Sequence, residues 1–423
     1  MLYAIFALSA LLQQPAACTA RDTYCRELGA LAADAGMRRA VAYIERTDKQ
    51  AIGELIALTQ IPAPPFKEAE RAHRYAELLR AAGADSVGID EVGNVIAVRR
   101  GLKRTRAVAV AGHIDTVFPE GTDVRVRQRG DTLFAPGVAD NTRGLIALLQ
   151  VLRALVNAHV QTDADILIVG TVGEEGLGDL RGTKHLFRAG ARRIDAFIAV
   201  DGASDETITS SGIGSKRYRV TFAGPGGHSW GAFGTANPIH ALGRAIHLFD
   251  DAAARFTATG PATSYNIGRI GGGTSVNSIP TQAWAEVDIR SESAVRLETL
   301  DSMFHVLMVT ALNDENALRT TGPELTLEAR LVGNRPSGET AAALPLVQRA
   351  IAATRLLGLT PRLDESSTDA NAAIAHGVPA ITLGRGGRAG NTHSPGEWWI
   401  NLNGVRGIRR ILYTVVAEAG LAR

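Results

Sequence analysis

The feature that most constrains the fold is an alternation of helical patterns with short apolar runs between Asp48 and about Ser210. This alternation is typical of βαβ units, which build a mostly parallel sheet covered by helices. A further apolar run of the same kind comes about 180 residues after the third. The four runs are residues 108–112, 166–171, 197–200 and 380–383. We therefore expect an α/β domain to which both the first half and the end of the chain contribute.

Residues 213–331 follow a different pattern, which predicts a domain inserted into the α/β domain. Its expected elements run in the order strand, helix, strand, strand, helix, strand, which is the ferredoxin-like α+β arrangement. Their expected bounds are 218–222, 238–255, 265–270, 283–289, 295–311 and 324–331. The full expected division is a signal peptide at 1–20, an N-terminal helical segment at 21–47, a catalytic domain at 48–212 and 332–423, and the inserted domain at 213–331.

The N-terminus carries an apolar run at residues 2–12, LYAIFALSALL. This run is shorter than the ~20 residues that span a bilayer, and with the small residues that follow it fits a signal peptide. We expect an exported protein, periplasmic or secreted, with no membrane span in the mature chain. Because no Lys or Arg precedes the run, an uncleaved anchor, a misassigned start codon and a cytoplasmic location stay open as alternatives.

Two cysteines, Cys18 and Cys25, are the full cysteine content of the chain. They lie seven positions apart, so we expect neither a cysteine-ligated zinc site nor a disulfide framework. Cleavage after Ala20 would leave one free cysteine.

The net charge is only +2, with 45 basic and 43 acidic residues mixed along the chain. A nucleic-acid-binding protein would concentrate positive charge on one face. We therefore expect a small molecule as the partner, and no nucleic acid.

Each of the four apolar runs ends in a loop that carries potential metal ligands. Because ligands bind outside the carboxyl ends of parallel strands, these side chains are expected to converge. His113 and Asp115 lie two apart at a strand end, so their side chains face the same way, and Asp115 can orient the His113 imidazole. The candidates after the other runs are Glu174 and Glu175, Asp201, and His393.

Asp140 precedes an apolar helix at residues 145–155, where its alternative role is that of a helix N-cap. Glu174 and Glu175 lie between glycines at a strand end, and two crowded carboxylates repel each other unless cations lie between them. Zinc accepts histidine and carboxylate ligands, and two ions ~3.5–4 Å apart can share a bridging carboxylate. The spacing alone does not decide which of the two glutamates binds metal.

Eight motifs in order resemble the dinuclear-zinc exopeptidases of peptidase family M20. That family includes tripeptide aminopeptidase, glutamate carboxypeptidase, acetylornithine deacetylase, succinyl-diaminopimelate desuccinylase and aminoacylases. The motifs are GHIDT (112–116), ADNTRG (139–144), TVGEEGLG (171–178), VDG (200–202), GGHS (226–229), SVNSIP (275–280), STDA (367–370) and NTHSPGEWW (391–399). The resemblance covers residues 48–415 and implies a zinc-exopeptidase catalytic domain with an inserted lid domain.

The resemblance also implies two zinc ions per subunit, with cobalt or manganese as alternatives. It places His113, Asp140 and Asp201 on one ion, and Asp140, Glu175 and His393 on the other. Asp140 is then the bridging ligand, Glu174 the general base and Asp115 the residue that orients His113.

The inserted domain is, by the same resemblance, a lid and the surface of a homodimer. His228 would stabilise the oxyanion of the tetrahedral intermediate, often across the dimer. Asn277 and Arg290 would hold a substrate carboxylate, for which arginine offers two parallel donors. The Gly-rich stretch 384–390 is either a backbone contact to an anion or a flexible loop.

The expected activity is zinc-dependent hydrolysis of an amide bond in a small, carboxylate-bearing substrate. Residues 366–370 and 384–399 look most like tripeptide aminopeptidases, so we expect a di- or tripeptidase-like exopeptidase. An N-acyl-amino-acid deacylase is the alternative, and a non-catalytic binding relative is the remote one.

Overall fold

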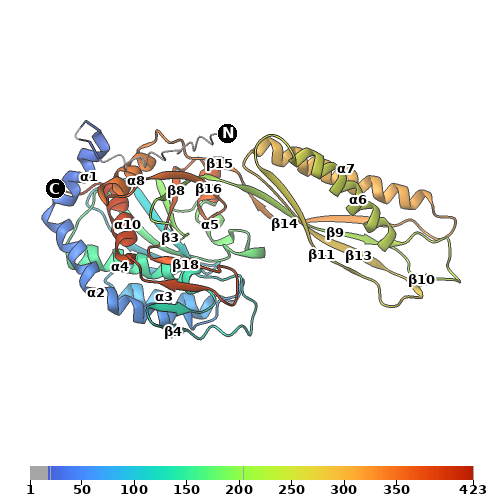
Figure 1. The fold of residues 1–423 in the computed structure, drawn as a ribbon, viewed down its shortest axis with the longest axis horizontal. Coiled ribbons are helices and arrows are strands. Elements are labelled where there is room, and N and C mark those ends of the chain that lie inside the picture. The colour runs from blue at the N-terminus through green and yellow to red at the C-terminus, as the bar shows by residue number, and fades with distance from the viewer. Residues whose placement is uncertain (1–17, 20, 203, 423) are drawn as a thin grey trace, which may run out of the picture.

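The computed structural model describes residues 18, 19, 21–202 and 204–422. Figure 1 shows a large body and a narrow one that projects from it, joined through β9 and β14. The expected signal peptide lies outside the described residues except for positions 18 and 19. None of the described helices is long and apolar enough to cross a membrane.

A nine-stranded sheet forms the centre of the large body. Its four central strands, in the order β6, β3, β7 and β17, are parallel and buried along their whole length. They are β6 (Asp165–Thr171), β3 (Ala107–His113), β7 (Ala196–Val200) and β17 (Ala380–Leu383). The four apolar runs of the sequence therefore form the middle of the sheet, which confirms the α/β prediction. The outer strands are β1 (Ser86–Ile89), β2 (Val95–Arg99), β8 (Thr207–Gly212), β15 (Gly338–Glu339) and β16 (Arg362–Ser366).

Helices cover both faces of this sheet, because alternate residues of a strand point to opposite faces. Val108 and Val110 of β3 belong to the larger core, whereas Ala109 and Ala111 belong to a smaller one. The helices of the larger core are α1 (Thr23–Ala33), α2 (Ala35–Thr59), α3 (Ala69–Ala81), α4 (Gly144–Asn157), α8 (Pro345–Leu356) and α10 (Gly404–Ala419). Those of the smaller core are α5 (Arg181–Leu186) and α9 (Ala370–Ala375).

The N-terminal helices pack into the larger core. Leu28 of α1 and Ile44 of α2 are fully buried there. The expected boundary after residue 47 falls inside α2, which continues unbroken to Thr59. The first two helices are thus part of the large body.

A disulfide bond joins Cys18 to Cys25. The expectation that the cysteines form no disulfide is therefore wrong. The segment before α1 turns back toward the first turn of that helix, so the two Cα atoms lie 5.4 Å apart, within the range that a disulfide spans.

A small four-stranded sheet lies beside the central one and supports the loops of the site. Its strands, in spatial order, are β18 (Arg388–Gly390), β19 (Trp398–Ile400), β5 (Thr132–Phe134) and β4 (Arg127–Arg129). The pairing of β19 with β5 brings the C-terminal motif beside the segment that carries Asp140. That segment, Val138–Arg143, is a kinked turn in which Asp140 and Asn141 depart from helical backbone angles, and it leads into α4.

The narrow body is a four-stranded antiparallel sheet with two helices on one face. The strand order β11-β13-β9-β14 and the chain order strand, helix, strand, strand, helix, strand agree with the ferredoxin-like expectation. The elements are β9 (Gly214–Ala223), α6 (Pro238–Thr257), β11 (Thr263–Gly272), β13 (Gln282–Ser291), α7 (Ala294–Ala317) and β14 (Thr326–Arg335). Since β14 continues to Arg335, its last residues extend beyond the expected end at 331.

Phe222, Phe249 and Phe304 form the centre of the core between this sheet and its helices. A short antiparallel pair of strands, β10 (Gly227–His228) with β12 (Ser278–Ile279), lies at the end of the narrow body away from the large one (Figure 1). No helix of the described residues lies over the opposite face of the sheet, which carries charged side chains.

Candidate metal centre

The carboxyl ends of the four central strands bring the expected ligands together. His113 is the last residue of β3, and Asp201 directly follows β7. Glu174 and Glu175 follow β6 after a turn at Gly173, which has a φ of 68° and so favours glycine. The chain beyond β17 leads to His393. Parallel strands end at the same edge of the sheet, so residues far apart in sequence meet there.

Asp140 lies between two histidines. Its Oδ1 atom is 3.2 Å from Nε2 of His113, and its Oδ2 atom is 3.2 Å from Nε2 of His393. Asp201 approaches His113 on one side, with 4.0 Å between Oδ2 and Nε2, and Glu175 approaches His393 on the other, with 3.0 Å between Oε1 and Nε2. One carboxylate therefore faces two ligand groups, as a bridging ligand does.

Two sets of three ligand atoms follow from this arrangement, each with its atoms within 4.8 Å of one another. The sets are His113 with Asp140 and Asp201, and Asp140 with Glu175 and His393. A third set joins His113 to Glu174 and Glu175. Imidazole nitrogen and carboxylate oxygen are the donors that zinc accepts, so the side chains fit a divalent metal at both places. The first two sets are those that the sequence predicts, although the geometry alone does not exclude Glu174 from the ligands.

Glu397 holds the loop that carries Asp140. Its buried carboxylate accepts hydrogen bonds from the backbone N–H groups of Gly137, Ala139 and Asp140, at 2.9–3.0 Å. The peptide bond between Asp140 and Asn141 is cis. Glu397 was not among the predicted site residues, although it lies in the NTHSPGEWW motif, and that motif was the available signal.

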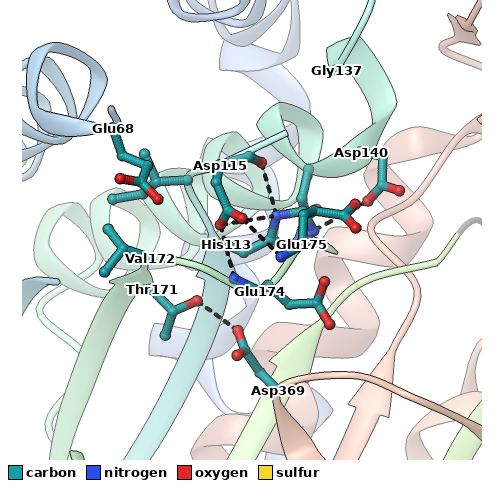
Figure 2. Close-up of polar contacts among 12 residues, drawn as sticks. Glu68, His113, Asp115, Gly137, Asp140, Thr171, Val172, Glu174, Glu175 and Asp369 are labelled. Atoms are coloured by element: carbon teal, nitrogen blue, oxygen red, sulfur yellow. Dashed lines mark hydrogen bonds and ion pairs between the residues drawn. The ribbon is translucent and has the colours of Figure 1, made fainter. Parts of the chain in front are cut away.

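Asp115 acts on its neighbours differently from the expectation. Its carboxylate accepts hydrogen bonds from the backbone N–H groups of Glu174 and Glu175, at 3.1 and 2.8 Å (Figure 2). The His113 Nδ1 atom lies 3.0 Å from the backbone carbonyl of Asp115 and 3.8 Å from its carboxylate. The carboxylate is fully buried, so it pairs with the two nearby donors. Asp115 thus orients His113 mainly through its backbone and fixes the two glutamates through its side chain.

Glu174 forms an ion pair with Arg335, which the sequence analysis did not single out. The Arg335 Nη1 atom donates to Oε1 of Glu174 at 2.9 Å and to the hydroxyl of Ser367 at 3.1 Å. Its Nη2 atom donates to the backbone carbonyl of Glu174. Glu174 and Arg335 are both buried, and no sequence motif connects them, because they are 161 positions apart.

Arg385 is a second buried arginine at the site. Its Nη1 atom donates to Oδ1 of Asp140 at 3.1 Å and to Oδ1 of Asp201 at 2.7 Å. Its side chain is 3% exposed. The Gly-rich stretch 384–390 therefore contributes an arginine side chain to the site, which was not among the expected roles of that stretch.

The charges of the cluster shift the pKa values of its members in the metal-free protein. Burial raises the pKa of Glu175 to about 7, against the hydrogen bond from His393. Hydrogen bonds to Asp140 and then Glu175 raise the pKa of His393 to about 10. Although burial acts in the opposite direction, Arg385 and the two histidines hold the pKa of Asp140 well below its usual range. The carboxylates and histidines thus share protons that a bound divalent cation would replace.

A cavity of about 470 Å³ opens beside this cluster and reaches the inserted domain. Its lining includes Arg290, the carboxylate-binding residue that the resemblance implies. His228 and Asn277 do not line it; both are exposed and belong to the β10–β12 end of the narrow body. A single chain therefore brings Glu174 and Arg290 together with the predicted metal ligands. It leaves His228 and Asn277 apart from them.

The Nε2 atom of His228 is the donor nitrogen of its ring. Its Nδ1 atom accepts from the backbone N–H groups of Trp230 and Gly231, at 3.2 and 3.3 Å. A neutral imidazole that accepts at Nδ1 carries its proton on Nε2. That N–H is therefore available to a partner outside the described chain.

Together, the fold and the paired histidine–carboxylate sets define a metal-dependent hydrolase of amide bonds. Residues 109–417 match the model of Peptidase family M20/M25/M40, and the chain belongs to this family. A putative succinyl-diaminopimelate desuccinylase of Mycobacterium tuberculosis is 27% identical over 339 residues, 78% of this chain and 88% of the relative. Carboxypeptidase G2 of a Pseudomonas species is 26% identical over 332 residues, 75% of this chain and 74% of the relative.

Solved structures give the same fold. The crystal structure of aminopeptidase PepT from Bacillus cereus superposes with a TM-score of 0.68 at 21% identity, covering 88% of this chain and 98% of that one. This likeness supports the α/β fold of the chain with its large, mainly parallel central sheet. The chain is a hydrolytic enzyme by family, and its substrate is a separate question.

Proposed function

We propose that the protein is a zinc-dependent exopeptidase that cleaves small peptides with a free carboxylate. The observation that carries the proposal is the position of Asp140, whose two oxygens face His113 and His393 separately. This geometry suits two divalent ions with one bridging ligand. The proposed ligands are His113, Asp140 and Asp201 for one ion, and Asp140, Glu175 and His393 for the other.

Divalent ions at this site would polarise the scissile carbonyl and lower the pKa of a water molecule toward ~7. Glu174 accepts the proton of the attacking water and delivers it to the departing amine. Arg335 and the Asp115 carboxylate hold Glu174 in place during this transfer, through its side chain and its backbone respectively. Arg290 holds the substrate carboxylate and so fixes the scissile bond relative to Glu174.

We also propose that two copies associate through the inserted domain and that His228 and Asn277 act on the substrate bound by the partner. Two facts support this. Both residues are exposed and lie away from the cavity of their own chain. Around them, Trp230 is 87% exposed and Phe233 is 85% exposed, and large aromatic side chains of this kind are typical of interfaces.

Export is a further proposal. The apolar run at residues 2–12 and the disulfide between Cys18 and Cys25 support it, since disulfides persist mainly in oxidising compartments.

The experiment that tests the activity is hydrolysis of a mixed panel by the zinc-loaded protein. The panel contains dipeptides, tripeptides, and N-acetyl and N-succinyl amino acids, with Glu174→Gln as the inactive control. Cleavage of peptides with release of a terminal residue is the expected result, and the residue released identifies the end that is trimmed. Cleavage of the N-acyl amino acids alone would replace the proposal with a deacylase, for which the desuccinylase relative is the supporting observation. No cleavage by a protein that binds metal would make it a non-catalytic relative.

A further inference from the structure

The cavity beside the metal centre is lined almost entirely by charged and hydroxyl side chains. Among the described residues that line it, none has an aliphatic side chain or the ring of a phenylalanine, tyrosine or tryptophan. Four arginines and four carboxylates face it, together with serines and threonines such as Thr209, Ser366 and Ser367. A pocket for an apolar side chain would instead be lined mainly by hydrophobic groups. The substrate groups that enter this cavity are therefore polar.

The balance of charge in the cavity changes when metal binds. The four carboxylates belong to the metal cluster, and the four guanidiniums offset them in number. Each divalent ion would bring two positive charges and displace protons that the cluster holds, so the net charge added would be smaller than the charge of the ions. Two of the arginines, Arg335 and Arg385, are held in ion pairs with cluster carboxylates. The remaining two, Arg217 and Arg290, face the cavity from the inserted domain.

Asp288 holds Arg217 and Arg290 side by side. Its Oδ1 atom accepts from Nε of Arg217 at 3.1 Å, and its Oδ2 atom accepts from Nε of Arg290 at 2.6 Å. Arg217 lies directly opposite Asp288 in the β9–β13 register, and Arg290 follows two residues later on the same face. One carboxylate thus offsets two guanidiniums, and a positive charge remains.

The outer nitrogens of these two arginines have donors to spare. The Nη1 atom of Arg217 donates to the backbone carbonyl of Gly176, and its Nη2 atom has no hydrogen bond within the described part of the chain. Neither Nη atom of Arg290 has one there. Arg290 can therefore bind a carboxylate through two parallel hydrogen bonds, and Arg217 can donate to one from Nη2.

We propose that this cavity selects substrates with two carboxylates, of which Arg290 binds one and Arg217 binds the other. The inference rests on the proposed function and specifies its substrate class, namely peptides or N-acyl amino acids that carry an acidic side chain or an acidic acyl group. Arg217 is then a specificity-determining residue, and Asp288 is the residue that positions both arginines.

The test compares matched substrates that differ by one negative charge. The pairs are Ala-Glu with Ala-Gln, and N-succinyl-alanine with N-butyryl-alanine. For the pair that the protein cleaves, we expect kcat/KM of the doubly anionic substrate to exceed that of its partner by about tenfold or more. This factor corresponds to one hydrogen bond between charged groups. In Arg217→Gln, this ratio should fall toward one. A loss of folding or of loop position would lower both rates together, so the ratio separates specificity from structure.

Arg219→Gln is the matched control. Arg219 lies two residues further along β9 on the same face, pairs with Glu286 at 2.9 Å and does not line the cavity. This variant should keep the wild-type ratio. Equal kcat/KM values for the two members of a pair in the wild type, or equal ratios in Arg217→Gln and the wild type, would overturn the proposal.

A binding measurement separates this inference from the proposed function. Calorimetry on zinc-loaded Glu174→Gln should show tighter binding of glutarate than of butyrate. The difference should disappear in the double variant that carries both Glu174→Gln and Arg217→Gln. If no substrate of the panel is hydrolysed, the proposed function fails while this measurement still decides the inference. Equal affinities for glutarate and butyrate in zinc-loaded Glu174→Gln would overturn it.

Discussion

Arg335 donates a hydrogen bond from Nη1 to Oε1 of Glu174 over 2.9 Å. Both side chains are buried, and Arg335 is the last residue of β14, the strand through which the chain leaves the inserted domain. The two carboxylates Glu174 and Glu175 favour the charged form of Arg335 and raise its pKa, although burial acts in the opposite direction. The proposed base is thus held by the junction between the two bodies of the molecule.

Replacement of Arg335 by Gln should therefore lower kcat more than it raises KM. The carboxylate of Glu174 would lose its fixed orientation, and misplacement of a catalytic group by about 1 Å can cost about 100-fold in rate. The metal ligands stay intact, so metal content should be unchanged. Arg330→Gln is the control, because Arg330 is an exposed residue of the same strand. An Arg335→Gln enzyme with the wild-type kcat would show that the ion pair does not position the base.

Glu174→Gln should lose turnover while it keeps its metal. The amide has the shape of the carboxylate but accepts no proton, and a positioned general base contributes typically about 10²–10⁴-fold. Steady-state kinetics and metal analysis on the same preparation measure the two properties. Normal hydrolysis by this variant would refute the role of Glu174 as base, and loss of metal would indicate that Glu174 is a ligand.

Asp140→Ala and Asp201→Ala should differ in how much metal they lose. Asp140 faces both ligand sets, so its removal should abolish tight binding of both ions, whereas Asp201 belongs to one set. After the protein is loaded with zinc and unbound zinc is removed by dialysis, we expect close to zero ions per chain for Asp140→Ala and one for Asp201→Ala. Retention of two ions by Asp140→Ala would remove it as the bridge.

The central strands and the candidate ligands at their carboxyl ends were predictable because both follow local rules, whereas the assignment of each ligand to an ion came from the family resemblance. Buried parallel strands are continuous apolar runs, and their carboxyl ends are marked by the residues that come next, as for His113 and Asp201. The order of elements in the inserted domain followed from periodicity in the same way. Boundaries were less accurate, since the last residues of β14, including Arg335, pair with β9 through tertiary contacts.

The residues that surround the ligands were not predictable from such rules. Three residues contact the site from more than 150 positions away in the sequence: Glu397 contacts the loop of Asp140, Arg335 contacts Glu174, and Arg385 contacts Asp140. Nothing in the local sequence of Arg335 or Arg385 distinguishes these residues from exposed charges, whereas Glu397 lies in the NTHSPGEWW motif. The hydrogen bonds that the Asp115 carboxylate accepts from the backbone N–H groups of Glu174 and Glu175 likewise depend on the turn after β6, which only the folded chain forms.

Asp369 gives a test of buried charge through the pH dependence of stability. Burial, followed by the nearby charge of Glu174, raises its pKa from the ordinary 3.8 to about 6. The folded state then holds the proton more tightly than the unfolded state, so this group costs stability as the pH rises from about 4 through 6. Asp369→Asn removes that cost but weakens one of the hydrogen bonds from Thr171 and Thr183.

Relative to wild type, the free energy of unfolding of Asp369→Asn should therefore increase between pH 4 and pH 7, by on the order of 2 kcal/mol, so the variant becomes the more stable of the two as the pH rises. Chemical denaturation of the metal-free protein at several pH values measures it. A difference that stays constant across this range would mean that Asp369 has the same pKa in both states.

The disulfide bond constrains where a signal peptide can be cleaved. Cys18 is bonded to Cys25, which lies in the first turn of α1, so a chain cut after Ala20 would lack one partner and expose a thiol. We expect cleavage before Cys18 in a natural exporting host. Thiol titration of the purified mature protein under denaturing conditions should then find no free thiol before reduction and two after it. N-terminal sequencing locates the cut independently. One thiol before and after reduction, with a chain that begins beyond Cys18, would show that the disulfide is absent from the mature enzyme.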